Sequence, residues 1–166
     1  MIEMRLASRG EEDMIIDLLN RASLRLHQLG VKDQWAKNGF CDSKDYFMDA
    51  IEAGQIYFAC LNDQICGVVL IRYQDLDIWG PDDGGAGYIH HLGVDKRKAY
   101  PGLGKDILLR AEGVIRKSGR SVVRLDCLQT NRRLNQYYLD QGYFMVKDNI
   151  YEDGVIGRLY EKRLDE

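Results

Sequence analysis

Two glycines near the middle of the chain stand between a short apolar segment and an amphipathic one. Gly102 and Gly104 fall in the turn between a predicted strand that ends at Val94 and a predicted helix that begins near Leu103. The first turn of a helix has unpaired N–H groups and the positive end of the helix dipole, which together bind phosphate. Glycine lets a bulky anion approach the backbone closely, so residues 94–105 predict a phosphate-binding turn. The alternative is an ordinary strand-to-helix connection.

Two better-known phosphate motifs do not fit this turn. A P-loop requires Ser or Thr after its Gly-Lys pair, whereas Asp106 follows Gly104 and Lys105 here. A dinucleotide-binding fingerprint requires a third glycine where this chain has Ile107. Pro101 suits the first position of a helix, where a missing N–H is least harmful. The turn therefore predicts a phosphorylated ligand of another class.

A second segment, residues 131–143, has the residue types of a short helix. Asn131 is a good helix cap, and Gly142 is a good stop after the last helical residue. Tyr138 places one hydroxyl on this helix. Considered alone, it is typical of a core aromatic whose hydroxyl has a hydrogen-bond partner.

Together the two segments resemble the GNAT superfamily of N-acetyltransferases. Residues 94–104 are similar to its pattern V-x4-(R/Q)-x-x-G-x-(G/A), and residues 131–143 are similar to N-x2-A-x3-Y-x3-G-(F/Y). Their order and separation also resemble that family, as does the predicted order of elements along nearly the whole chain. Two departures stand out, because the family's Arg or Gln falls on Ala99 and Pro101 removes one backbone donor.

The resemblance implies a binding site for acetyl-CoA. No metal is expected, because no His, Cys and Asp residues have the spacing of metal ligands. In the family, the pantetheine arm enters between two splayed parallel strands and pairs with strand backbone, which Gly93 would help by easing a bulge. Asn131 would bond near the pantetheine, and Tyr138 would point at the sulfur. Backbone N–H groups of the turn would hold the diphosphate. The implied cofactor-binding residues are Leu92, Gly93, Val94, Ala99, Tyr100, Gly102, Leu103, Gly104, Lys105, Asn131 and Tyr138.

The implied reaction transfers an acetyl group to a primary amine by direct attack in a ternary complex. An alkylamine has a pKa of about 10.4, so a base must take a proton from it, directly or through water. Family members place such a base at positions that match Tyr88 or His90, which share one strand face. Of the two, only His90 titrates near neutrality; its alternative is a partly buried structural histidine. Tyr138 would protonate the leaving thiolate.

Two other functions stay open at this stage. A non-catalytic acyl-CoA-binding or sensing module would keep the same fold without turnover, and Ala99 and Pro101 favour it. A βαβ domain for another phosphorylated ligand would share only the glycine turn. The expected acceptor is a small-molecule or peptide amine, and a homodimer is left open.

The elements that must position these residues follow from hydrophobic periodicity and turn residues. Helices are predicted after a cap at Ser8, from about Ser43, from Leu103 and from about Asn131, each stopped by a glycine. Residues 74–87 are polar and glycine-rich and predict a mobile loop, whose aspartates would attract a cationic amine or merely solvate the loop. The predicted strands cover residues 2–7, 56–61, 65–73, 88–94, 121–128, 142–146 and 155–162.

This order predicts an α/β fold with a mixed sheet and helices on both faces. The resemblance implies that this sheet is mostly antiparallel. Residues 88–128 form a βαβ unit, whose two strands would be the splayed parallel pair of the GNAT acyl-CoA N-acyltransferase fold. A chain of 166 residues suffices for one core and is too short for two ordinary ones. We therefore expect a single domain over residues 1–166.

Composition narrows the compartment and the partners. The formal charge is -3, which gives no electrostatic reason to bind nucleic acid or an anionic membrane surface. The basic residues are spread out except at 96–98, which suit the phosphate ends of coenzyme A or a solvated turn. No apolar stretch approaches the ~20 residues of a membrane helix, and no signal peptide is expected. Four cysteines without CxxC spacing predict buried thiols and a reducing cytoplasm.

Overall fold

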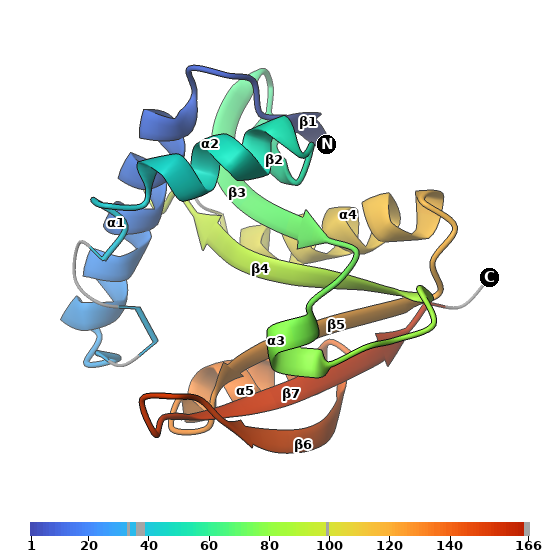
Figure 1. Ribbon diagram of the computed structural model, residues 1–166. Coiled ribbons are helices and arrows are strands. Elements are labelled where there is room, and N and C mark those ends of the chain that lie inside the picture. Colours follow the sequence, from blue (N-terminus) through green and yellow to red (C-terminus); the bar gives the residue numbers. More distant parts are fainter. Residues whose placement is uncertain (33, 36–38, 99, 165–166) are drawn as a thin grey trace. The chain divides into compact units, whose positions relative to one another are not determined.

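The computed structural model describes residues 1–32, 34–35, 39–98 and 100–164. Within these residues the chain forms two compact units, one of Met1–Ile71 with His91–Ala111 and one of Arg72–His90 with Glu112–Glu166. The strands are β1 Ile2–Leu6, β2 Ile56–Leu61, β3 Gln64–Arg72, β4 Ala86–Val94, β5 Val122–Leu128, β6 Phe144–Ile150 and β7 Ile156–Arg163. The helices are α1 Glu12–Gln28, α2 Lys44–Glu52, α3 Leu76–Trp79, α4 Leu103–Lys117 and α5 Arg132–Asp140 (Figure 1).

The strands form one hydrogen-bonded sheet in the order β1-β2-β3-β4-β5-β7-β6. Antiparallel pairs join β1 to β2, β2 to β3, β5 to β7 and β7 to β6. The pair of β4 and β5 is parallel, with Ala86 opposite Val122 and Tyr88 opposite Arg124. Parallel neighbours need a crossover connection, which α4 provides. The predicted α/β fold with a mostly antiparallel sheet and one parallel pair is confirmed.

In the first unit, strand alternation sends apolar side chains to both faces of β2 and β3. Phe58 and Val68 are buried in a cluster with side chains of α1 and α2. Their neighbours Ala59 and Gly67 face the other way, toward Ile107 of α4. A period of two along a strand requires this division. Helices therefore cover both faces of these strands, as the sequence predicted.

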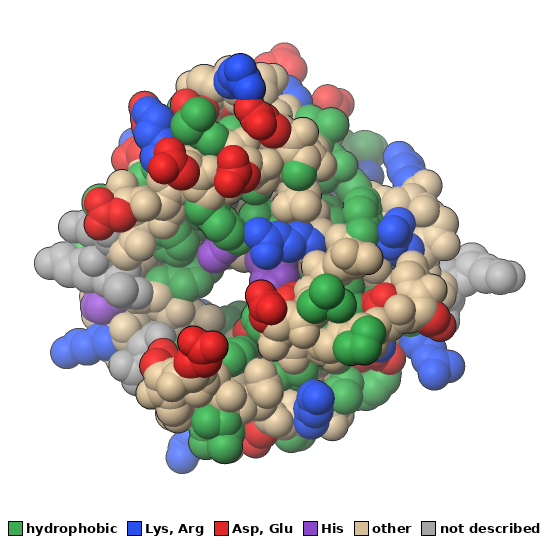
Figure 2. Space-filling view, in the orientation of Figure 1, with side chains coloured by type: hydrophobic (Ala, Val, Ile, Leu, Met, Phe, Trp, Pro, Cys, Tyr) green, Lys and Arg blue, Asp and Glu red, His purple; other side chains and the backbone are tan. Residues whose placement is uncertain are grey.

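The outer face of α2 is acidic. Figure 2 shows Asp and Glu side chains over this helix, and its exposed acidic residues are Asp45, Asp49 and Glu52. Lys44 Nζ lies 3.0 Å from Asp13 Oδ1 of α1. An exposed ion pair of this kind adds little stability, so the two helices depend on their buried apolar side chains. Among the described residues, no helix has both the length and the apolar composition that crossing a bilayer requires.

In the second unit, α5 lies on one face of β5 and β7 and α3 on the other (Figure 1). The Tyr160 hydroxyl of β7 donates to Asn135 Oδ1 of α5 at 2.6 Å. The next residue, Glu161, accepts from Arg124 Nε at 2.8 Å on the opposite face. The guanidinium of Arg124 lies 4.9 Å from the ring centroid of Trp79 in α3. Both faces of this part of the sheet are thus covered by polar as well as apolar contacts.

Several local signals in the sequence are confirmed. Asn62 and Asp63 have φ of 50° and 61° and form the two-residue turn between β2 and β3. Two successive left-handed residues are what a type I′ hairpin turn needs. The glycines predicted to stop helices also adopt positive φ, at Gly30, Gly54, Gly119 and Gly142.

Other predicted boundaries are wrong. Ser8 does not cap α1, which begins at Glu12, because the Ser8 N–H donates to Glu11 Oε2 at 2.7 Å in a turn that precedes the helix. Pro101 lies two residues before the first residue of α4. The predicted loop over residues 74–87 contains α3 and the start of β4. The four cysteines are free, but only Cys66 and Cys127 are buried, whereas Cys60 is half-buried and Cys41 is exposed.

Gly67 is a position where a methyl group would meet backbone atoms. A Cβ there would lie 2.5 Å from Ile107 Cδ1 and 2.9 Å from the carbonyl oxygen of Gly93. We expect Gly67→Ala to lower the free energy of unfolding by about 1–3 kcal/mol, measured by urea denaturation. Gly113→Ala is the matched control, because its Cβ would meet no atom within 4 Å and alanine favours a helix interior by up to about 1 kcal/mol. Equal stability of the two variants would contradict this close packing.

Candidate active site

A buried carboxylate shapes the chain directly after β4. Asp95 is 5% exposed, and its N–H donates to the Cys66 carbonyl of β3 at 2.9 Å. Its carboxylate accepts the Arg97 backbone N–H at 3.0 Å, Nε at 3.1 Å and Nη2 at 2.8 Å. Arg21 Nη2 of α1 lies 3.4 Å from the same carboxylate. The hydrogen bonds from Arg97 lower the pKa of Asp95 to about 2, so Asp95 is ionised throughout the neutral range.

The basic residues 96–98 differ in whether their side chains pair with the Asp95 carboxylate. The guanidinium of Arg97 is bound to Asp95. The Lys98 N–H donates to the Asp95 carbonyl at 3.0 Å, and the side chains of Lys96 and Lys98 are exposed. An ammonium group binds phosphate as a point charge. Lys96 and Lys98 are therefore the basic side chains of residues 96–98 that are exposed and do not pair with Asp95, whereas Arg97 does.

The first turn of α4 has two backbone donors in succession without an acceptor. The Leu103 N–H donates to the Tyr100 carbonyl at 3.1 Å, and the N–H of Asp106 begins the ladder of the helix. Between them, the N–H groups of Gly104 and Lys105 meet no acceptor in the described part of the chain. Adjacent N–H groups at the positive end of a helix form an anion-binding geometry. Because the Leu103 N–H already has an acceptor, it is removed from the set of phosphate donors that the sequence suggested.

The turn before α4 is held by its own residues. The Tyr100 hydroxyl donates to Asp106 Oδ2 at 2.5 Å. Gly102 has φ of 95°, a left-handed conformation that glycine adopts without strain. Its carbonyl accepts the Asp106 N–H at 3.0 Å. Ala99, which the motif places in this turn, lies outside the described residues, so its role stays a prediction.

The last residues of β4 are packed on both faces. Leu92 and Val94 contact the buried cluster on the α4 side, which leaves their backbone groups as the parts suited to a ligand. A Cβ at Gly93 would lie 2.9 Å from Leu19 Cδ2, so the close approach of α1 requires glycine here. The left-handed residue of this strand is His91, with φ of 48°, and not Gly93.

The two neighbouring histidines of β4 have different surroundings. His90 Nε2 lies 3.0 Å from Asp75 Oδ2, and the two side chains are 15% and 7% exposed. The His91 ring packs edge-on against Tyr46 and Phe47, and its Nε2 lies 3.2 Å from the Tyr46 hydroxyl. A histidine beside a carboxylate is a common arrangement for a general base. His90 lies beside a carboxylate in this way, at ion-pair distance and without the alignment of a hydrogen bond.

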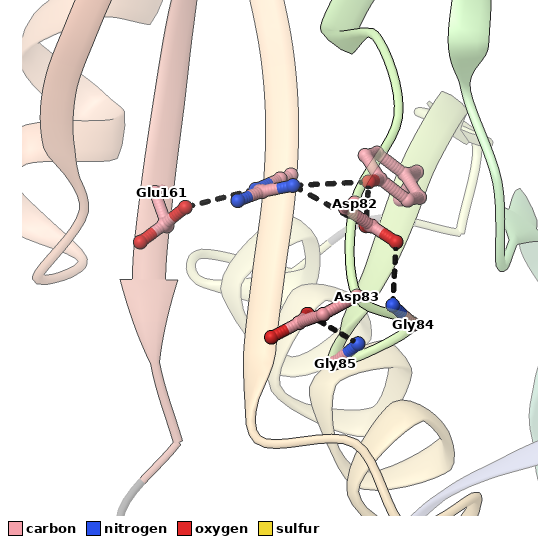
Figure 3. Close-up of polar contacts among 7 residues, drawn as sticks. Asp82, Asp83, Gly84, Gly85 and Glu161 are labelled. Carbon is pink, nitrogen blue, oxygen red and sulfur yellow. Dashed lines mark hydrogen bonds and ion pairs between the residues drawn. The ribbon is translucent and has the colours of Figure 1, made fainter.

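Tyr88, the other predicted base, belongs to a polar network that Figure 3 shows. Its hydroxyl donates to Asp82 and accepts from Arg124 Nη1 at 3.0 Å. Arg124 also lies 3.3 Å from Asp82 Oδ2 and 2.8 Å from Glu161 Oε2. Burial and the hydrogen bond to Asp82 raise the pKa of Tyr88 to about 12. Because Tyr88 keeps its proton at neutral pH, His90 is the better candidate for a base.

The same network holds the segment that the sequence predicted to be mobile. Asp82 Oδ1 accepts the Gly84 N–H at 2.7 Å, and Asp83 Oδ1 accepts the Gly85 N–H at 3.0 Å (Figure 3). The hydrogen bond from Tyr88 lowers the pKa of Asp82. These carboxylates form specific hydrogen bonds within the protein, which corrects the expectation that they merely solvate a loop.

The start of α5 is fixed by two asparagines. Asn131 Oδ1 accepts the Leu134 N–H at 3.2 Å, which confirms the predicted cap. Asn135 is 7% exposed and donates to the carbonyls of Leu128 at 2.9 Å and Asn131 at 2.8 Å. Its Oδ1 accepts from Tyr160 of β7. These bonds fasten α5 to the end of β5 and to β7.

Tyr138 lies on the buried face of α5 and is 9% exposed. Its ring packs against Tyr143 and Tyr160, with centroids 5.7 and 5.9 Å away. Burial raises its pKa well above the ordinary value of 10, so the hydroxyl is protonated at neutral pH. No residue that the structure describes forms a hydrogen bond with this hydroxyl. Tyr138 therefore has a proton to donate and a hydroxyl that is not already engaged.

Cys127 of β5 is unsuited to nucleophilic catalysis. Burial raises its pKa to about 12, and the thiolate rather than the thiol is the nucleophile. Across the described ranges, no three or more His, Cys, Asp or Glu side chains are grouped as metal ligands.

The family model for the acetyltransferase (GNAT) family matches residues 13–143. The chain belongs to this family. The GNAT chain is 31% identical over 147 residues to the uncharacterized N-acetyltransferase YesJ of Bacillus subtilis (strain 168), covering 83% of this chain and 79% of that protein. It is accordingly an N-acetyltransferase.

Solved GNAT structures share its fold. The acetyltransferase of Listeria monocytogenes 4b F2365 matches with a TM-score of 0.78 at 24% identity, over 98% of this chain and 95% of that one. The aminoglycoside acetyltransferase AAC(6')-Ib, in complex with coenzyme A and kanamycin, matches with a TM-score of 0.76 at 18% identity, over 98% and 95% of the two chains. At these identities the similarity establishes the fold.

Both GNAT motifs lie within the matched residues 13–143. The residues that the sequence predicted for the site are divided between the two units. The first unit contains the residues of the turn and of the end of β4, and the second contains Tyr88, His90, Asn131 and Tyr138. The sequence analysis gave no role to Asn135 or Asp95. It considered Asp75 as a loop residue that would attract a cationic amine or solvate the loop, and not as a partner of His90. Asp95 had a local signal, an Asp directly after a strand and two residues before an Arg. Asp75 had none, because its contact with His90 is distant in sequence.

Asp95 offers a test of the turn by its stability. Its pKa is about 2 in the folded protein and about 3.9 in an unfolded chain, so its contribution is complete above the unfolded value and disappears as the pH falls through about 2. We expect Asp95→Asn to lower the free energy of unfolding by about 2–3 kcal/mol at pH 7. Urea denaturation measures this loss, and the gap to the parent protein should narrow toward pH 2. Asp49→Asn on the exposed face of α2 is the control; a gap that stays constant with pH would contradict this role for the carboxylate.

Proposed function

We propose that this GNAT enzyme, as a single domain over residues 1–166, transfers the acetyl group of acetyl-CoA to a primary amine by direct attack in a ternary complex. The main support is the pair of N–H groups of Gly104 and Lys105 at the start of α4, which have no acceptor in the described part of the chain. Such donors attract a phosphate group, and coenzyme A contains a diphosphate. Because the chain belongs to the GNAT family, we propose coenzyme A as the source of this phosphate.

The cofactor would be held chiefly by backbone. The diphosphate would rest on residues 100–105, whose turn is prepared by the Tyr100 to Asp106 hydrogen bond and by left-handed Gly102. Lys96 and Lys98 would add positive charge. The pantetheine arm would pair with the backbone of residues 92–94, whose side chains are already packed. In this proposal Asn131 lies near the pantetheine and Tyr138 near the sulfur.

The amine must lose a proton before its nitrogen can attack. We assign this proton to His90, through a water molecule, because imidazole titrates near neutrality and Tyr88 is held in its protonated form. The amine lone pair then forms the N–C bond to the thioester carbon, and the resulting oxyanion is stabilised by backbone N–H groups. A base of this kind typically accelerates a reaction by about 10²–10⁴-fold.

Collapse of the tetrahedral intermediate breaks the C–S bond and leaves a thiolate. Tyr138 would donate its proton to that sulfur, since burial keeps its hydroxyl protonated. The positively charged nitrogen of the intermediate loses its second proton to solvent as the amide forms. The phenolate is then reprotonated from solvent, His90 releases its proton to solvent, and no covalent bond to the protein is formed. The high pKa of Cys127 agrees with such direct transfer.

The acceptor is proposed by class only. AAC(6')-Ib was crystallised with coenzyme A and kanamycin, which supports a small-molecule amine. A peptide amine fits the same chemistry. Four free cysteines suit a reducing compartment, so we propose that the enzyme acts in the cytoplasm.

A thiol-release assay over a panel of primary amines tests the proposed reaction. Release of coenzyme A that depends on both acetyl-CoA and one amine, together with mass spectrometry of an N-acetylated product, is the expected result. Calorimetry with acetyl-CoA gives the binding constant separately. Tight binding without turnover on any amine would contradict the proposed transfer.

Tyr138→Phe removes the proposed acid and keeps the ring. We expect kcat to fall by about tenfold or more, while the affinity for acetyl-CoA by calorimetry changes by less than about threefold, because the hydroxyl acts mainly in the transition state. Tyr137→Phe makes the same chemical change on the same helix and should leave kcat unaltered. Equal losses of affinity and kcat in Tyr138→Phe would refute the acid role.

His90→Ala removes the proposed base. At saturating amine, turnover of the parent enzyme should rise with pH through the range in which imidazole loses its proton, and the variant should lose that step. Near neutrality we expect kcat to fall by about 10²-fold. His27→Ala on α1 is the control. A His90 variant with the same pH profile as the parent would exclude His90 as the base.

A further inference from the structure

We propose that Asp75 is a positioning residue for His90, an inference that rests on the proposed function. Asp75 Oδ2 lies 3.0 Å from His90 Nε2. Both side chains are largely buried, with 7% and 15% of their surface exposed. The two atoms lie at ion-pair distance without the alignment of a hydrogen bond, so the carboxylate acts on the imidazole through its charge and its close packing. The geometry of a general base decides how well it works.

The backbone of Asp75 is held by the short helix that follows it. Its carbonyl accepts the Trp79 N–H at 2.9 Å, which closes the turn of α3. The Trp79 ring packs edge-on against Tyr88 of β4 with centroids 6.1 Å apart. It also receives the Arg124 guanidinium at 4.9 Å. Asp75 therefore reaches His90 from a segment that is packed against β4 and β5.

The other end of this segment is fastened as well. Asp82 binds the Tyr88 hydroxyl and lies 3.3 Å from Arg124 Nη1 (Figure 3). It also accepts the Gly84 N–H. With contacts at both ends, the segment between β3 and β4 holds Asp75 in one place relative to the strand that contains His90.

Charge pairing explains why this carboxylate is matched with a histidine. Arg124, whose guanidinium lies over Trp79 of the same segment, pairs with Glu161 and Asp82. The charge-bearing partner of Asp75 in the described structure is His90. When His90 takes the amine proton, the imidazolium forms beside a carboxylate rather than as an unpaired buried cation, which would be costly. Asp75 thus orients the base and balances the charge that the reaction creates.

A double-mutant cycle tests this coupling. We expect Asp75→Asn to lower kcat by about tenfold or more while KM for acetyl-CoA changes by less than about threefold. In the His90→Ala background the same substitution should lower kcat by less than about twofold, because its effect passes through the imidazole. Asp77→Asn, the same change at an exposed residue of α3, should leave kcat unaltered. An equal loss of kcat in both backgrounds would overturn the positioning role.

Two further measurements keep the outcome decisive. Acetyl-CoA affinity by calorimetry shows whether each variant is folded. If Asp75→Asn is not folded, Asp75→Glu, which keeps the charge, replaces it. In ¹⁵N-labelled protein the imidazole nitrogen resonances of His90 should move in the Asp75 variant and stay in Asp77→Asn; unmoved resonances would overturn the inference. Absence of turnover on every amine would instead refute the proposed function, and an active His90→Ala enzyme would refute the base together with its positioning residue.

Discussion

The guanidinium of Arg124 is the group on which the polar structure of the second unit depends. A cation taken out of water costs several kcal/mol unless it is paired and hydrogen-bonded, and arginine offers five N–H donors in a planar fork. Here Glu161 and Asp82 supply negative charge, and the Tyr88 hydroxyl supplies an acceptor. Trp79 covers the remaining face. One side chain of β5 therefore fixes β7, β4 and the segment around α3 at the same time.

That arrangement also decides which groups of β4 are left for chemistry. Tyr88 is committed to Asp82 and Arg124, and its pKa is raised to about 12. His90, two residues along the same strand, has Asp75 as its carboxylate. Tyr88 and His90 share one strand face, so their positions in the sequence do not distinguish their roles, but their hydrogen-bond and charge partners do. One is a structural hydroxyl within a charged network, and the other is a titratable ring beside an acid.

The sequence predicted those parts of the fold whose cause is local. Helix stops at Gly54 and Gly119 depend on left-handed φ, and the turn at Asn62 depends on the same conformation, so each is visible in a few residues. Order and alternation of the apolar runs then predicted the mixed sheet and its parallel pair. Within the site, the turn at Gly102 and the cap at Asn131 were predicted for the same local reasons.

Features that depend on distant partners were not predictable in this way. Gly93 was predicted to ease a bulge, but the sequence did not reveal that the nearness of Leu19 in α1 also requires glycine here. Polar composition between β3 and β4 suggested mobility, because the charges that pair with its aspartates come from residues far along the chain. A local sequence pattern predicts the conformation that a residue can adopt, whereas tertiary contacts determine the role of that residue in the structure.

The proposed chemistry needs a proton removed at one group and supplied at another, and the second unit provides two groups whose environments differ in the required sense. Burial against Tyr143 and Tyr160 keeps the Tyr138 hydroxyl protonated. Asn135 fixes the helix that carries Tyr138 by hydrogen bonds to Leu128 of β5, to Gln129, to the cap residue Asn131 and to Tyr160 of β7. A donor that is already in place and poorly solvated stabilises a developing thiolate without the cost of reorienting water. The environment that makes this tyrosine a poor base is therefore the same one that makes it an effective hydrogen-bond donor to sulfur.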